Sequence, residues 1–166
     1  IATLPATLRA RRPVPPMATQ PNDDDERPLR GLADLVSVFE SAEKPAQRYR
    51  IGVEAEKFGV HTPTGAPLSY DGERSVRRIF DALIKLGWLP ERESENGPVV
   101  ALRRNGASIT LEPGSQLELS GAALPDLHAA SAEFVEHLGE LRPISEELEL
   151  AWLGVGFHPI ARQEDL

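Results

Sequence analysis

Apolar and polar residues recur with two different periods along the chain, and these periods predict its helices and strands. Apolar residues at helical spacing predict three helices, over residues 30–43, 73–86 and 125–149. Alternating patterns and short apolar runs predict five strands, over residues 48–59, 98–103, 107–112, 115–120 and 151–157. Helices mixed with strands that lie close together in sequence predict an α+β fold with an antiparallel sheet.

Glycine and proline mark several places where these elements end. Asn105-Gly106 is a strong two-residue hairpin signal between the second and third strands. Pro113-Gly114 separates the third strand from the fourth. Pro143 falls inside the last helix, where proline removes a backbone hydrogen bond, so we expect a kink or a split into two helices there.

Glutamates occupy one face of the first predicted strand. Residues 49–60 read YRIGVEAEKFGV, and the side chains of a strand point alternately to its two faces. Glu54 and Glu56 therefore project from the same face. Lys57 points the opposite way, where we expect an ordinary surface lysine.

Further polar groups share strand faces in residues 109–121, which read ITLEPGSQLELSG. Glu112 ends one strand, and Gln116, Glu118 and Ser120 share one face of the next. With the glutamates of the first strand this makes a set of carboxylates that repel one another, and a buried carboxylate is unfavourable unless it is paired or binds a metal. A hard divalent cation with oxygen ligands, usually together with phosphate, would relieve that repulsion.

Composition narrows the classes of protein. The chain has 166 residues, enough for one domain with a core, and its net charge of -8 argues against nonspecific nucleic-acid binding. No apolar run approaches membrane-spanning length. The absence of cysteine excludes disulfides and thiolate chemistry and is consistent with a cytoplasmic protein. Residues 1–28 are rich in proline and charge, which predicts a disordered tail before a domain over residues 29–166.

Four stretches of the chain, taken together, resemble a known enzyme family. They are RIGVEAEKFGV, ITLEPGSQLELSGAAL, LHAASAE and EELELAWLGVGFHP. Their order and spacing are similar to those in the N-terminal part of glutamate–cysteine ligase of the plant and proteobacterial type, over roughly Arg48 to the end. The resemblance implies part of a curved antiparallel sheet with packing helices, similar to the catalytic region of glutamine synthetase.

The resemblance also implies a reaction and its participants. ATP phosphorylates the γ-carboxylate of glutamate, and the amine of cysteine then attacks γ-glutamyl phosphate, which is the first step of glutathione synthesis. Mg²⁺ is the implied cofactor, because it offsets phosphate and carboxylate charge during the transfer. The implied partners are these small molecules, with no nucleic acid and no membrane.

Residue roles follow from the matching motifs, and no general acid or base is among them. The implied metal ligands are Glu54, Glu56, Glu112 and Glu118, and the implied substrate contacts are Gln116 and Ser120. Ala55 stands where the family often has a histidine between the two glutamates, so this position supplies no ligand. The lack of cysteine also excludes the redox control that plant members can exert through cysteine pairs.

Other interpretations remain open. Glu54 and Glu56 could form a solvated strand face, Glu112 could be a turn residue, and Arg103-Arg104 is expected to be a solvated pair rather than a phosphate clamp. The ligase could serve another thiol pathway or join another amine to glutamate. The chain could instead be a noncatalytic metal- or nucleotide-binding module, or a hydrolase with paired carboxylates.

Length separates this chain from the family it resembles. Family members are considerably longer, so residues 29–166 are expected to be the N-terminal portion of a catalytic domain. We expect the 166 residues alone not to catalyse ligation, because few arginines or lysines lie beside the glutamates to bind anionic substrates. The sequence leaves the oligomeric state open.

Overall fold

The computed structural model describes residues 28–162 and divides into two compact units, each described by itself. The described part of the first unit, residues 28–43, holds helix α1 (Leu32–Ala42), which has no buried residue. The predicted tail, residues 1–28, lies outside the described residues except for Pro28. No helix in the described part of the chain has both the length and the apolar character needed to cross a membrane.

The second unit, from Lys44 onward, is built on a six-stranded antiparallel sheet. In chain order the strands are β1 (Glu54–His61), β2 (Leu89–Arg92), β3 (Val99–Arg104), β4 (Ala107–Glu112), β5 (Gln116–Ser120) and β6 (Leu150–Leu153). Their order across the sheet is β2-β3-β4-β5-β1-β6. The predicted α+β class with an antiparallel sheet is therefore confirmed.

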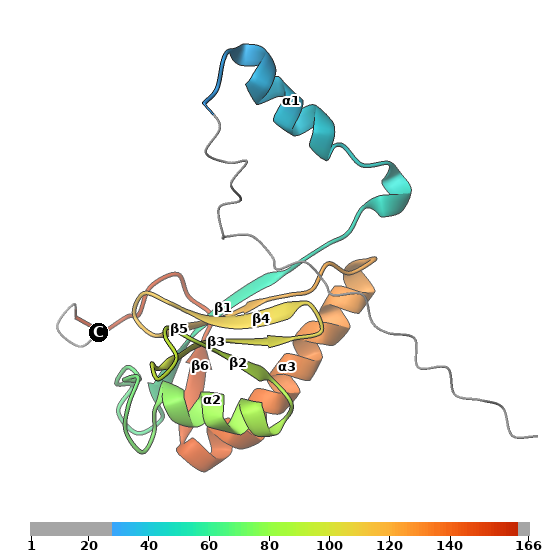
Figure 1. Ribbon diagram of the computed structural model, residues 1–166. Helices are drawn as coiled ribbons and strands as arrows, with labels where there is room; N and C mark the ends of the chain where they lie inside the picture. Colours follow the sequence, from blue (N-terminus) through green and yellow to red (C-terminus); the bar gives the residue numbers. More distant parts are fainter. Residues whose placement is uncertain (1–27, 163–166) are drawn as a thin grey trace, which may run out of the picture. The chain divides into compact units, whose positions relative to one another are not determined.

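Two helices, α2 (Val76–Lys85) and α3 (Leu127–Leu148), pack against one side of the sheet (Figure 1). A short 3₁₀ helix, η2 (Ala46–Arg48), precedes β1. The core between helices and sheet is apolar and includes Val76, Ile79, Phe80, Leu83, Leu102, Ile109, Leu117, Leu119, Leu141, Ile144 and Leu148. No helix of the second unit, as far as it is described, contributes to the opposite face of the sheet, which we call the open face.

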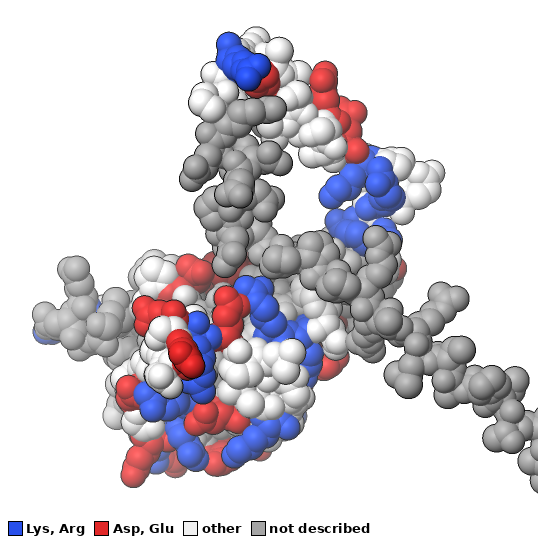
Figure 2. Space-filling view, viewed as in Figure 1, with Lys and Arg blue, Asp and Glu red and all other residues white. Residues whose placement is uncertain are grey.

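Acidic and basic side chains are interspersed over the part of this unit that Figure 2 presents. Around α2, Arg77 pairs with Asp71 at 2.5 Å and Arg78 approaches Glu147 at 3.8 Å. Exposed ion pairs of this kind contribute only about 0–1 kcal/mol each. The buried apolar surface, rather than these ion pairs, therefore holds the helices on the sheet.

Several predicted boundaries need correction. β1 begins at Glu54, not at residue 48, because residues 46–48 form η2 and Ile51 makes only an isolated bridge, to Leu124. β6 covers Leu150–Leu153 rather than residues 151–157. The edge strand β2 was not predicted at all, since all four of its residues are exposed and carry no apolar alternation.

Of the two outcomes predicted at Pro143, a kink or a split, the split is wrong, because α3 runs unbroken from Leu127 to Leu148. Proline removes only one backbone hydrogen bond, and buried residues on both sides of it hold the helix in place. Leu141 and Ile144 are 1% and 6% exposed, respectively. Burial of apolar surface thus outweighs the local preference of proline to end a helix.

Gly59 of β1 lies against the side chains of Leu68 and Trp152. A Cβ added there would collide with the Leu68 side chain and would lie 3.2 Å from Trp152 Cζ3. Gly59→Ala is therefore expected to lower the free energy of unfolding by about 1–3 kcal/mol, as overpacking does. Urea unfolding measures this. Gly139→Ala is the control, because nothing lies within 4 Å of a Cβ there, and inside α3 alanine is expected to leave stability unchanged or raise it by up to about 1 kcal/mol. Equal stability of Gly59→Ala and the unchanged protein would contradict the expected collision.

Candidate functional site

The pairing of β1, β5 and β4 places the predicted glutamates on one face of the sheet. Glu56 pairs with Glu118, and Glu118 pairs in turn with Thr110 of β4. Residues that pair directly in an antiparallel sheet project to the same side. Glu54 and Glu118 therefore lie on the same side, as a shared site requires.

Two further cross-strand pairs complete this set of polar groups on the open face. Glu54 pairs with Ser120, and Glu112 pairs with Gln116. All six residues predicted from the sequence thus lie on the open face, within three adjacent strands. We call this set the carboxylate face: Glu54, Glu56, Glu112, Gln116, Glu118 and Ser120.

Glu118 stands at the centre of the carboxylate face and is its most enclosed carboxylate. It is 8% exposed, whereas Glu54, Glu56 and Glu112 are all exposed. Two neighbours bind these carboxylates. Ser120 Oγ donates a hydrogen bond to Glu118 Oε1 at 2.7 Å, and Gln116 Nε2 donates one to Glu56 Oε2 at 3.1 Å.

The crowding of the carboxylates affects the protonation of Glu112. A hydrogen bond with Glu118 raises the pKa of Glu112, and burial and the negative charges of Glu118, Glu56 and Glu54 raise it further. A proton held by Glu112 takes the place of a positive charge. The carboxylate face thus concentrates more negative charge than its own side chains neutralise.

The donor set of this face is chemically suited to a hard divalent cation, since it consists entirely of oxygen and amide groups. In the arrangement described, no three His, Asp or Glu side chains of residues 28–162 converge on a point that could hold a metal ion. Ser120 and Gln116 engage Glu118 and Glu56, respectively. Their side chains would have to rotate before Glu118 and Glu56 could serve together as ligands.

The two arginines before the hairpin lie on opposite faces of β3. Arg103 pairs in register with Ser108 and so lies on the open face, where it is bonded to Glu91 at 2.5 Å. Arg104 lies on the helix side, bonded to Glu140 at 2.6 Å and stacked 4.3 Å from the centre of the Trp88 ring. The predicted solvated pair is therefore wrong for Arg104, which is partly buried.

Lys57 lies on the helix side of β1, directly behind the carboxylate face. We expected a surface lysine, but the residue is 5% exposed. Its Nζ lies 3.0 Å from Nε2 of His137, a buried residue of α3. Burial lowers the pKa of Lys57 to about 8, although the negative charge of Glu118 acts to raise it. Burial, followed by the charges of Lys57 and Arg104, lowers the pKa of His137 to about 3.

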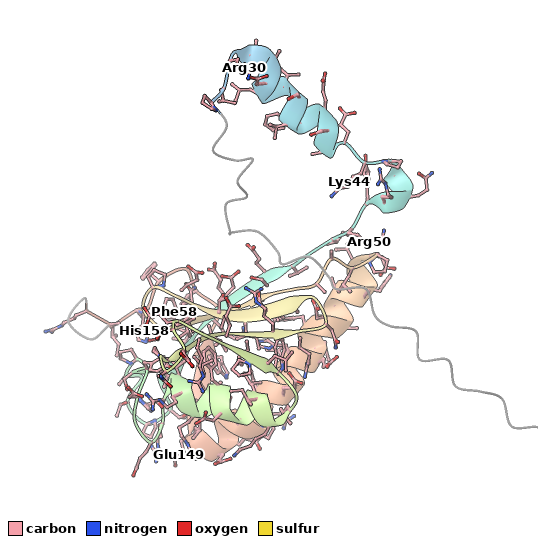
Figure 3. The ribbon with its side chains drawn as sticks, in the orientation of Figure 1. Arg30, Lys44, Arg50, Phe58, Glu149 and His158 are labelled. Carbon is pink, nitrogen blue, oxygen red and sulfur yellow. The ribbon has the colours of Figure 1, made fainter. Side chains whose placement is uncertain are left out.

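The chain that follows β6 returns to the end of the open face nearest Gln116. Gln116 Nε2 reaches the Val155 carbonyl at 3.5 Å, and the ring of His158 meets the ring of Phe58 edge-on with centroids 5.5 Å apart (Figure 3). His158 Nδ1 accepts a backbone hydrogen bond from Ala161 at 3.0 Å. Its Nε2 is buried and has no hydrogen-bond partner among the described residues.

The best-defined cavity in the described part of the chain lies away from the carboxylate face. It has a volume of about 580 Å³, lies between α3 and β6, and is lined by residues that include Leu138, Leu141 and Trp152. It contains none of the predicted site residues. The candidate site is thus a polar sheet face and not an enclosed pocket.

Sequence reasoning missed His137 and His158. The apolar stripe of the helix predicted over residues 125–149 includes Leu138, but Leu138 is 40% exposed, and the buried residue beside it is His137, at 2%. A search for core positions that allowed a histidine in the stripe would have found it. His158 directly follows the strand predicted over residues 151–157, and nothing in the sequence pattern indicated that it returns to Phe58.

Comparison with known proteins identifies the family. Residues 50–166 match the model of glutamate-cysteine ligase family 2 (GCS2). The chloroplastic glutamate–cysteine ligase of Arabidopsis thaliana is 37% identical over 134 residues, which are 80% of this chain and 25% of that protein. The chloroplastic glutamate–cysteine ligase A of Oryza sativa subsp. japonica is 40% identical over 127 residues, 76% of this chain and 25% of that protein.

These relatives also correct one prediction. They and the similar protein of Solanum lycopersicum are named chloroplastic, which contradicts the predicted cytoplasmic location. The prediction rested on the absence of cysteine, and cysteine content reports a redox environment rather than an organelle. The chain spans about a quarter of the length of the relatives it matches. Its match over residues 50–166 shows that it belongs to glutamate-cysteine ligase family 2.

Proposed function

We propose that the intact protein that carries this chain joins the γ-carboxylate of glutamate to the amine of cysteine in an ATP- and Mg²⁺-dependent reaction. Membership of the family supports the reaction class. The observation that carries the proposal is the register of β1, β4 and β5, which gathers Glu54, Glu56, Glu112 and Glu118 on one open face. A solvated strand face would not explain why its central carboxylate, Glu118, is 8% exposed.

The four glutamates are the residues that would hold Mg²⁺. When bound, the ion offsets the charge of the phosphates and carboxylates and aligns them for phosphoryl transfer. Glu118 is the central ligand in this proposal, because the strands that flank it carry Glu56 on one side and Glu112 on the other. Because its pKa is raised, Glu112 holds a proton more readily than an isolated carboxylate does, and binding of a cation would release that proton.

Gln116 and Ser120 are proposed to contact substrate. Both now donate to carboxylates of the face, and each has further hydrogen-bonding capacity. If Glu56 and Glu118 held a cation, the amide of Gln116 and the hydroxyl of Ser120 would be available to bind glutamate. Arg103, on the same face, is a cation that could bind an anionic substrate group on release from Glu91.

The test is an assay of the intact protein with ATP, Mg²⁺, glutamate and cysteine. Mass spectrometry is expected to show γ-glutamylcysteine, and a coupled assay is expected to show an equal amount of ADP. Omission of glutamate should abolish both products, and substitution of other amines for cysteine identifies the preferred acceptor. The 166-residue chain alone is included and is expected to be inactive. Failure of the intact protein to form ADP in a glutamate-dependent way would refute the proposal.

A further inference from the structure

Lys57 places a buried ammonium directly beneath the carboxylate face. An ammonium has three N–H donors, and Nζ of Lys57 has three acceptors within reach. These are the carbonyl oxygen of Ala55 at 3.0 Å, that of Leu117 at 3.5 Å and Nε2 of His137 at 3.0 Å. Every donor of this buried cation is therefore directed at an acceptor.

The two carbonyl groups connect Lys57 to the strands that carry the central glutamates. Ala55 lies between Glu54 and Glu56 in β1, and Leu117 precedes Glu118 in β5. Lys57 and Leu117 are also Cα partners in the register of these two strands. One side chain thus bridges β1 and β5 directly behind the pair formed by Glu56 and Glu118.

His137 holds the third donor and connects this bridge to α3. An ammonium can only donate, so His137 accepts at Nε2 and carries its own proton at Nδ1. Nδ1 is buried without a hydrogen-bond partner in the described structure, beside a cavity of about 60 Å³ that His137 and Glu133 help to line. A water molecule fits such a polar cavity and would satisfy Nδ1.

A stability role alone does not account for this arrangement. Replacing buried charged groups by apolar side chains of similar volume is often neutral or stabilising, so a core does not need them. All three acceptors of Lys57 are neutral groups, and the charge that favours its protonated form is that of Glu118, on the opposite face. The common feature of its contacts is the β1–β5 pair that presents Glu56 and Glu118.

We propose that Lys57 and His137 form a positioning pair that fixes β1 against β5 and so sets the geometry in which Glu56 and Glu118 bind a divalent cation. The inference rests on the proposed function, since it takes the carboxylate face as the metal site. Neither residue touches substrate in this proposal. Their effect passes through the backbone carbonyls of Ala55 and Leu117 to the adjacent glutamates.

The test is Mn²⁺ binding to the intact protein, measured from the loss of the electron paramagnetic resonance signal of free Mn²⁺. The double variant Lys57→Met/His137→Leu replaces the pair by apolar side chains and is expected to keep its thermal stability. Its Kd for Mn²⁺ is expected to rise by about 10- to 100-fold, as when groups that orient metal ligands are removed. Loss of the lysine charge alone would instead tighten cation binding. Weaker binding therefore reports position and not charge.

Further variants make the result decisive. His137→Gln keeps an acceptor for Lys57 and is expected to restore Mn²⁺ binding to within about threefold of the unchanged protein, well short of the loss in the double variant. Lys85→Met, at an exposed lysine in the last turn of α2, serves as the control and should bind normally. If the double variant does not fold, the single variant Lys57→Met takes its place, and the same rise in the Kd for Mn²⁺ is expected.

The outcomes separate the inference from the function on which it rests. If Glu118→Gln weakens Mn²⁺ binding but a folded Lys57→Met/His137→Leu binds as tightly as the unchanged protein, the positioning pair is refuted and the metal site stands. If Glu118→Gln leaves Mn²⁺ binding unchanged, both the metal site and the positioning pair are refuted. Weaker binding in both variants, with recovery in His137→Gln, supports the inference.

Discussion

Replacing Glu118 by Gln is expected to lower the rate of ligation by the intact protein by at least about a hundredfold, since even groups that only orient metal ligands contribute 10- to 100-fold. Glu118 is the central carboxylate of the face, paired with Glu56 on one side and Thr110 on the other. The amide keeps the shape of the side chain but removes its charge. Initial rates at several Mg²⁺ concentrations measure the effect.

Stability is expected to move in the opposite direction from activity. Glu118 pairs directly with Glu56, and like charges in that position destabilise a sheet by about 0.2–1 kcal/mol. Glu118→Gln should therefore unfold at an equal or slightly higher urea concentration. Glu95→Gln, in the exposed turn between β2 and β3, is the control and should change neither quantity. Full activity of Glu118→Gln at saturating Mg²⁺ would exclude it as a ligand.

The polar strand faces could be predicted because alternation is a local property of the chain. Two of the pairings that join them are also local. The hairpin between β3 and β4 turns at Asn105 and Gly106, with φ of 52° and 92°, as the Asn-Gly signal predicts. The tight connection between β4 and β5 uses Gly114 and Ser115, with φ of 82° and 59°. The second of these turns sets the register of Glu112 relative to Glu118.

The pairing of β1 with β5 could not be predicted in the same way. Glu54 and Ser120 are partners that lie far apart in sequence, and no turn sets their register. What specifies it is burial, since a slip of one residue would move Lys57 and Ala55 to the open face and Glu56 into the core. The resemblance to a family indicated the shared site, and only the fold shows the strands that assemble it.

The helix side of the sheet shows the main limit of hydrophobic patterns. A pattern search treats histidine and lysine as surface residues, so it assigned Leu138 to the core and Lys57 to the surface. In the structure Leu138 is 40% exposed, whereas His137 and Lys57 are only 2% and 5% exposed, respectively. Their hydrogen bond across 80 positions of sequence reduces the cost of burying each polar group alone, and this contact cannot be seen until the fold is known.

His137 is expected to make the protein lose stability in mild acid. Burial, followed by the charges of Lys57 and Arg104, lowers the pKa of His137 from 6.5 to about 3. Between these values the unfolded chain binds a proton that the folded chain does not, so the free energy of unfolding rises with pH across this window. As the pH falls from about 6.5 to 3, the loss due to this residue is on the order of 4 kcal/mol. Above pH 6.5 its contribution is constant.

Urea unfolding at pH 7.0 and pH 4.5 measures this dependence in the unchanged protein and in His137→Gln. Carboxylates also titrate in this range, and the raised pKa of Glu112 acts in the opposite sense, because the folded state then binds its proton more readily. The comparison with His137→Gln cancels these shared contributions. The unchanged protein is expected to lose about 2–3 kcal/mol more than the variant between the two pH values. Equal losses in the two proteins would show that His137 is not held neutral by its burial against Lys57.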